Sequence, residues 1–249
     1  MTALAVAGRR FLPRGWTDLG CQLLIWFGFL LAYQVARGVA DRDPTRAFSN
    51  GLAVIRVEQH VNAFFELTLQ QFMAGSHVLS WVASFTYWNS EFTVVGLALL
   101  WVYLRRNEHF VRFRNWILAA NVIGLVGYVL IPTAPPRMFP DLGFADTLAG
   151  HAGLNHGSGL IELASNPYAA MPSLHAADAL IVGITLALIV RVWWARVLWL
   201  LWPAWVWFCV MATANHFVLD IVAGVAVALV AWLLVSRARA PFRTAQAAS

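Results

Sequence analysis

The feature that most limits the fold of this chain is a series of mostly apolar runs, each about as long as a bilayer is thick. A helix needs about 20 apolar residues to cross the hydrocarbon core of a membrane. We count six such runs in the 249 residues: 18–37, 77–104, 110–131, 174–190, 196–214 and 217–235. They predict an all-α polytopic membrane protein with six transmembrane helices. The second run is long and contains YWNSE at 87–91, so it is either one span or a short re-entrant helix followed by a span.

The composition and the placement of charge support this prediction. Hydrophobic residues make up 60% of the chain and charged residues 12%, which is outside the range of soluble globular proteins. Both cysteines, Cys21 and Cys209, lie in apolar runs, which disfavours a disulfide framework. All 17 cationic side chains are arginines, and they flank the apolar runs. The basic charge is therefore typical of membrane-flanking segments and not of a nucleic-acid-binding surface.

The arginines also predict how the bundle is oriented. They are concentrated in the tails 1–16 and 237–249 and in the connections 105–114 and 191–196. In a six-span protein these segments share one side, which the positive-inside rule assigns to the cytoplasm. We therefore expect a multi-pass protein of the cell (plasma) membrane with both termini in the cytoplasm.

Two long connections then lie on the outer side. The connection 38–76 contains Val54, Val57 and Val61 at helical spacing with polar residues between them, which predicts an outer amphipathic helix. The loop 132–172, between spans three and four, is too long for a simple connector and is typical of a functional loop. We find no internal repeat, so we expect one domain over 1–249 with its motifs in 132–224.

Two candidate sites flank the long loop. Arg137 follows PTAPP at the outer end of the third run; prolines fix the local backbone and suit aiming a side chain, although an interfacial anchor is the alternative. PSLH stands at 172–175, at the outer end of the fourth run. Proline is favoured at the first helical position, so the free amides at 173–175 and the helix dipole predict an anion site beside the Ser173 hydroxyl. His175 is either part of this site or structural.

A third candidate site begins the last run. His216 and Asp220 are four residues apart and share one face of a helix, where a carboxylate can orient an imidazole as a nucleophile. Asn215 either caps this helix or contacts substrate. Asp178, one turn beyond His175, either tunes that histidine or pairs inside the bundle. The alternative for His216 and Asp220 is a structural contact.

These sites meet at one membrane depth on the outer side, and together they meet the needs of phosphoryl transfer. We expect His216 to attack phosphorus with Asp220 orienting it, and His175 to protonate the leaving alkoxide. Arg137 and Ser173 would bind the phosphoryl oxygens. A phosphohistidine would then pass its phosphoryl group to water or to an alcohol.

At this point the sequence resembles a family, the type 2 phosphatidic acid phosphatase (PAP2) superfamily. PTAPPRM, PSLH and the HxxxD of His216 and Asp220 are similar to its three motifs, in order and over 132–224. The resemblance implies a metal-independent six-span enzyme without a cofactor, acting on a phospholipid or polyprenyl phosphate. Two motif cations are missing, because Leu130 stands in the place of a lysine and Cys209 and Val210 in the place of Ser-Arg. Arg42, Arg46 or Arg56 could replace them.

The form of the motifs is most similar to the branch that contains inositol phosphorylceramide synthase. This resemblance implies an alternative activity, transfer of a phosphoinositol-like head group to a small alcohol or polyol acceptor. A phosphodiester carries less charge than a monoester, so fewer cations fit diester chemistry.

Other interpretations remain open from the residues alone. A metal-dependent hydrolase would need His151 and His156 beside His216 and Asp220, an intramembrane protease would use Ser158, and a transporter would use the same membrane charges as a pathway. Further residues could line the cavity or serve only local structure: Asn166 and Tyr168 before PSLH, and Trp88, Asn89 and Glu91 in the second run.

Overall fold

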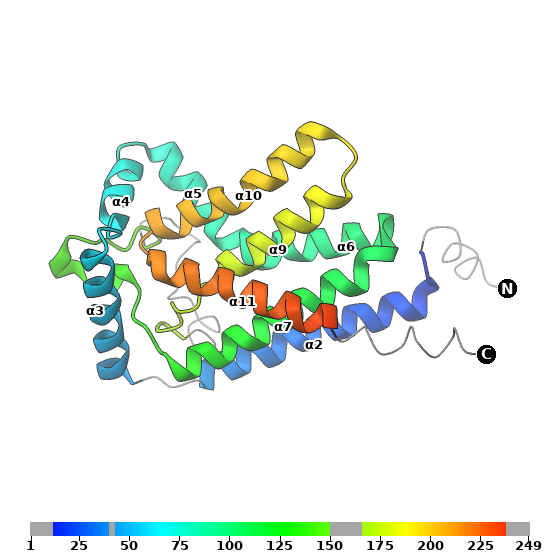
Figure 1. Cartoon of the computed structure of the whole chain (residues 1–249), viewed down its shortest axis with the longest axis horizontal. Coiled ribbons are helices and arrows are strands. Elements are labelled where there is room, and N and C mark those ends of the chain that lie inside the picture. Colours follow the sequence, from blue (N-terminus) through cyan, green and yellow to red (C-terminus); the bar gives the residue numbers. More distant parts are fainter. Residues whose placement is uncertain (1–11, 40–42, 150–165, 238–249) are drawn as a thin grey trace.

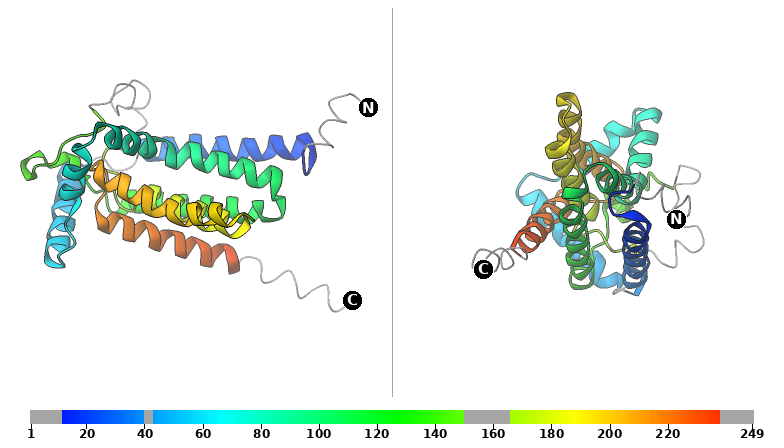
Figure 2. Two further views of the ribbon diagram at one scale, coloured as in Figure 1. Left: turned by 90° about the horizontal axis from the view of Figure 1, so that it is seen from above. Right: turned by 90° about the vertical axis from the view of Figure 1, so that its right-hand side faces the viewer.

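The computed structural model describes residues 12–39, 43–149 and 166–237. Within these ranges the chain forms helices and no β-strand, which confirms the all-α prediction. Figure 1 shows the long helices running side by side, with α3 lying across one end of the bundle. The N-terminal end of α2 and the C-terminal end of α11 lie at the other end (Figures 1 and 2).

Four described helices are long and apolar enough to cross a membrane. They lie within α2 (Gly15–Val39), α7 (Asn107–Leu130), α10 (Trp193–Ala212) and α11 (Val218–Arg237). The fourth expected span is α9 (Leu174–Ile189), which is apolar but only 16 residues long. By length and composition, therefore, four of the six expected spans stand out among the described residues.

The second expected span is a broken run. It consists of α5 (His77–Asn89), a π-helical turn η1 (Ser90–Val94) and α6 (Val95–Arg105). The two α-helices leave the turn in different directions (Figure 1). A π turn rotates the side chains that follow it relative to a regular helix, and such turns are frequent at functional sites. The polar residues in the middle of this run therefore mark a change of helix type.

The outer connection forms two helices instead of one. They are α3 (Pro44–His60) and α4 (Glu66–Ala74), and the chain turns between them at Asn62, whose φ is +56°. Asparagine tolerates this left-handed conformation better than most residues. The buried face of α3 includes Val54 and Glu58, whereas Val57 is 50% exposed. The apolar spacing thus predicted a helix but not which of its valines are buried.

The segment that joins the long loop to α9 is held by close helix packing. A Cβ atom at Gly224 of α11 would lie 2.2 Å from the Ser173 carbonyl oxygen, and one at Gly127 of α7 would lie 2.4 Å from Pro172. Both distances are below any real contact, so only glycine allows this approach. The two glycines therefore fix the start of α9 between α7 and α11.

Candidate active site

Backbone hydrogen bonds join the three sequence motifs at the end of the bundle near α3. The Arg137 amide donates to the Ala214 carbonyl at 2.8 Å, and the Ser173 amide donates to the Asp220 carbonyl at 2.9 Å. An isolated parallel bridge pairs Thr133 with Ala169. Because these bonds connect the backbone itself, the motifs are held at fixed relative positions whatever their side chains do.

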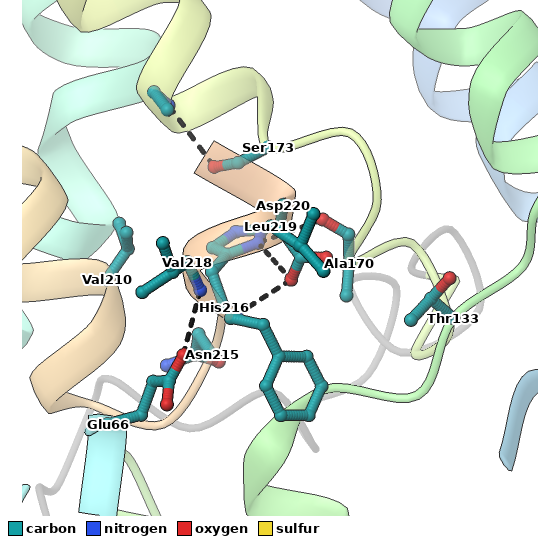
Figure 3. A network of polar contacts seen from close by, with 12 residues as sticks. Glu66, Thr133, Ala170, Ser173, Val210, Asn215, His216, Val218, Leu219 and Asp220 are labelled. Carbon is teal, nitrogen blue, oxygen red and sulfur yellow. Dashed lines mark hydrogen bonds and ion pairs between the residues drawn. The ribbon is translucent and has the colours of Figure 1, made fainter. Parts of the chain in front are cut away.

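His216 is held by the chain that precedes α9. Its Nδ1 lies 2.9 Å from the Ala170 carbonyl oxygen (Figure 3). A carbonyl can only accept, so Nδ1 carries a proton, and the lone pair of a neutral His216 ring is on Nε2. Asp220 Oδ2 lies 3.5 Å from Nδ1, which is longer than an N–H···O bond, and it accepts the Phe217 amide at 2.8 Å. Orientation therefore comes from Ala170, while Asp220 places a negative charge beside the ring.

Two further carboxyl groups cap the start of α11, and the sequence patterns did not indicate them. Glu66 accepts the Val218 amide at 2.8 Å, and Glu58 accepts the Leu219 amide at 2.7 Å. Both are almost fully buried, at 0% and 1% exposure. With Asp220, carboxyl groups from α3, α4 and α11 satisfy consecutive free amides of this helix end. Nothing in the spacing of Glu58 or Glu66 reveals contacts with residues so far along the chain.

One carboxyl group of this cap, that of Glu58, has an unusually high pKa. Burial, a hydrogen bond with Glu66 and the nearby charges of Glu66 and Asp220 raise the pKa of Glu58 to about 9, against a lowering by its backbone hydrogen bond from Leu219. At neutral pH Glu58 therefore carries a proton in the folded protein. The cap holds fewer negative charges than its carboxyl groups suggest.

This proton predicts how stability changes with pH. An unfolded Glu58 loses its proton near pH 4.5, while the folded group keeps it to about pH 9. The stability it contributes is thus complete below pH 4.5 and is lost as pH rises to 9. Glu58→Gln carries a permanent donor, so its melting temperature should match wild type near pH 4.5 and exceed it by about 5–10 °C at pH 9.

The measurement is thermal unfolding in detergent, followed by tryptophan fluorescence, from pH 4.5 to 9. The control is Glu108→Gln, which replaces an exposed carboxyl group whose side chain is 64% accessible. A gap between Glu58→Gln and wild type that stays constant over this pH range would contradict a proton held on Glu58.

His175 faces His216 from the first turn of α9. The ring centroids of the two histidines are 5.6 Å apart, and His175 stacks on Tyr87 at 4.5 Å with an interplanar angle of 14°. Its Nε2 lies 3.4 Å from Oε2 of Glu91, which is 5% exposed. Glu91 comes from the π-helical turn, so of the two uses left open for it, the structure places it at the cavity.

A small cavity of about 50 Å³ brings the candidate residues together. Arg137 donates to Asn215 Oδ1, and the Asn215 amide nitrogen in turn donates to both oxygens of Thr213. Thr213 therefore orients Asn215, and Asn215 orients Arg137. The lining consists of Tyr87, Glu91, Tyr128, Pro135, Arg137, Asn166, Pro167, Ala169, Ala170, His175, Asn215 and His216.

Three expected site residues lie outside this lining. Ser173 is buried and is the N-cap of α9, where its hydroxyl accepts the Ala176 amide at 3.2 Å. Asp178 accepts from Asn121 inside the bundle, at 3.0 and 3.2 Å. Tyr168 packs against Phe48.

The expected anion site at 173–175 also needs correction. Helix α9 begins at Leu174, so Pro172 precedes the cap instead of occupying the first helical position. The Ser173 amide is already used by the Asp220 carbonyl.

In the described part of the chain, Arg137 is the one arginine that lines the cavity. Arg46 donates instead to the carbonyl of Leu130, at 2.7 Å, and Arg56 is exposed on α3. Arg42 lies outside the described residues, as do His151, His156 and Ser158 of the rival interpretations. Among the residues described, no cluster of three or more His, Cys, Asp or Glu side chains has the arrangement of a metal site.

Comparison with known proteins places the chain in a family. The family model described as the PAP2 superfamily matches residues 52–234, most of the chain. The protein belongs to the PAP2 superfamily. This confirms the resemblance based on the three motifs, and it supports a lipid phosphatase or phosphotransferase over a transporter or a protease.

One curated relative of this PAP2 protein is a phosphoinositol dihydroceramide synthase from Bacteroides thetaiotaomicron. It is 29% identical over 151 residues, which cover 55% of this chain and 48% of the relative. The chain thus spans about half the length of the curated relative that it matches. Its name agrees with the inositol phosphorylceramide synthase-like form of the motifs. No solved structure matches the chain.

Proposed function

We propose that this PAP2 protein is a membrane-embedded enzyme that transfers a phosphoryl group from a phosphorylated lipid through a phosphohistidine on His216. The observation that carries the proposal is the state of His216. Its Nδ1 donates to the Ala170 carbonyl, which leaves Nε2 as the nitrogen that can attack. The ring lines the same cavity as Arg137 and His175. An imidazole in this tautomer is a nucleophile.

The reaction balances in two steps. In the first, Nε2 of His216 attacks phosphorus, the bond from phosphorus to the lipid oxygen breaks, and His175 gives its proton to that oxygen. In the second, water or an alcohol attacks phosphorus, loses its proton to His175, and the phosphorus–nitrogen bond breaks. Arg137 binds the non-bridging oxygens in both steps. Asp220 Oδ2 lies 3.5 Å from Nδ1 of His216 and Glu91 Oε2 lies 3.4 Å from Nε2 of His175, so each histidine ring has a carboxyl group beside it.

The position of the site relative to the membrane suits a lipid substrate. The site lies at the bundle end beside α3, and we place this end on the outer side of the cell membrane, with both termini in the cytoplasm. A lipid tail can then stay in hydrocarbon while its phosphate reaches the cavity. One domain carries the whole reaction.

A second candidate function is transfer of a whole phosphorylated head group, such as phosphoinositol, to an alcohol acceptor. Two observations favour it: the name of the curated relative, and a described lining that has one arginine and also the carboxylate of Glu91. A phosphodiester carries one negative charge and a monoester up to two, so this lining suits a diester better. In this case the lipid alcohol leaves in the first step and the acceptor hydroxyl replaces water in the second.

The test uses purified protein in detergent with excess chelator and a panel of phospholipids and polyprenyl phosphates. Free phosphate is measured beside lipid products by mass spectrometry, and the protein is quenched in alkali because the phosphorus–nitrogen bond is acid-labile. Phosphate release with a phosphorylated histidine supports hydrolysis. A new lipid that forms only with an added polyol, together with the histidine adduct of the head-group phosphate, supports transfer. Activity that chelator removes would contradict the mechanism.

A further inference from the structure

Asn166 lines the cavity next to the three motifs, although it belongs to none of them. It lies at the end of the long outer loop and is 2% exposed. Its side-chain oxygen accepts the Tyr168 amide at 2.9 Å, and its carbonyl oxygen accepts the Ala169 amide at 3.4 Å. This is a local turn closed by the asparagine side chain. Since Ala169 also pairs with Thr133, the turn is tied to the segment that leads to Arg137.

The amide nitrogen of Asn166 is buried without a hydrogen-bond partner in the structure as described. The orientation of the amide is determined, because the Tyr168 N–H is a donor and can pair only with oxygen. Two N–H donors are therefore unused on a side chain that lines the cavity. A buried donor without a partner is unfavourable and is rare in native proteins unless a ligand completes it.

The other side-chain amide of the lining, Asn215, has its oxygen and nitrogen both in use. Asn215 uses its oxygen for Arg137 and its nitrogen for Thr213. The two positions that carry cations in the family motifs hold Leu130 and Val210, and Arg137 is the one arginine in the lining that the structure describes. A phosphodiester has two non-bridging oxygens and a monoester has three, and each oxygen can accept more than one hydrogen bond. The fork of one guanidinium therefore leaves acceptor sites for a further donor.

We propose that Asn166 is a ligand of the substrate's non-bridging phosphoryl oxygen, a neutral donor that works beside Arg137. This inference rests on the function proposed above and assigns a further residue to that site. A neutral hydrogen-bond donor stabilises the negative charge that develops on the oxygen without raising the positive charge of the cavity. This fits a phosphodiester substrate. The amide donates hydrogen bonds only, and no bond to it forms or breaks.

The test measures turnover and inhibition by vanadate, a phosphate analogue that carries no head group. Asn166→Asp keeps the oxygen that accepts the Tyr168 amide but replaces the donors by a negative oxygen. Asn166→Ser also keeps an oxygen acceptor, and it replaces the two amide N–H donors by a single hydroxyl on a shorter side chain without adding charge. The control is Asn107→Asp, the same change at the start of α7, where the side chain donates to the Tyr103 carbonyl and does not line the cavity.

We expect the vanadate inhibition constant to rise about 10-fold in Asn166→Ser and about 100-fold in Asn166→Asp, with turnover falling about 100-fold or more, whatever head group the donor carries. Asn107→Asp should behave as wild type. Unchanged vanadate inhibition in both Asn166 variants, or a loss confined to the KM of one head group, would overturn the proposal. If wild type itself resists vanadate and forms no histidine adduct, the proposed function fails instead, so the two failures are distinguishable.

Discussion

Replacing His216 by glutamine is expected to lower lipid turnover by about 10⁴-fold or more while the protein stays folded. The loss is large because the variant has no ring nitrogen to form the covalent intermediate, and removal of a nucleophile removes both chemical steps. The residue is only 4% exposed, but a glutamine amide can still donate to the Ala170 carbonyl that now accepts from Nδ1. The start of α11 keeps its three carboxyl partners as well.

The measurement is the rate of product formation with the preferred lipid, beside the melting temperature and the alkali-quenched histidine adduct. His109→Gln is the matched control, since this histidine is 50% exposed and lies in the first turns of α7, away from the cavity. It should keep full turnover. Turnover by His216→Gln above a tenth of the wild-type rate, or a histidine adduct that persists in it, would show that another residue attacks phosphorus.

The candidate site could be predicted from the sequence where its residues belong to compact motifs. His175, His216 and Arg137 each stand at the boundary of an apolar run, and the alternating sides of the runs bring them to one end. The structure places these three around one cavity, with the two histidine rings 5.6 Å apart. The proximity of these three residues followed from the order of the apolar runs along the chain, which the hydropathy pattern shows.

What the sequence could not predict depends on backbone detail. The use of Glu91 was undecided because a π-helical turn, and not a regular helix, directs it toward His175. Ser173 was expected to bind phosphate, but a serine before a helix serves equally as its N-cap, and its hydroxyl bonds the Ala176 amide. The two alternatives share one sequence pattern, so only the structure distinguishes them.

Contacts between segments far apart in the sequence could not be predicted either. Glu58 and Glu66 lie in the outer connection, where the spacing predicted only an amphipathic helix, and both are buried against the first amides of α11. The fold was better predicted than these contacts, since the long apolar helices follow from composition alone. Hydropathy was a poorer guide to the count of spans, because α9 is 16 residues long and the run over α5 and α6 is broken.

Replacing Arg137 by alanine is expected to lower kcat/KM by about 10³-fold, and Arg137→Lys to restore about 10-fold of this loss. The guanidinium offers several donors in a planar fork, while lysine supplies only a point charge. The side chain is aimed by Asn215 and its backbone by the Ala214 carbonyl, so the cation has one defined position in the cavity. Removing one such donor costs about 10²–10³ in turnover in enzymes that stabilise an oxyanion.

Arg56→Ala is the matched control, and it also tests whether an outer arginine replaces the missing motif cations. Arg56 is exposed on α3 and does not line the cavity, so its variant should keep wild-type kcat/KM. A loss in Arg56→Ala close to that in Arg137→Ala would mean that α3 supplies a phosphate ligand once lipid binds. A large loss in Arg137→Ala alone would mean that one cation and neutral donors suffice for the phosphoryl group. This second result fits a phosphodiester donor, whose single charge needs no second arginine.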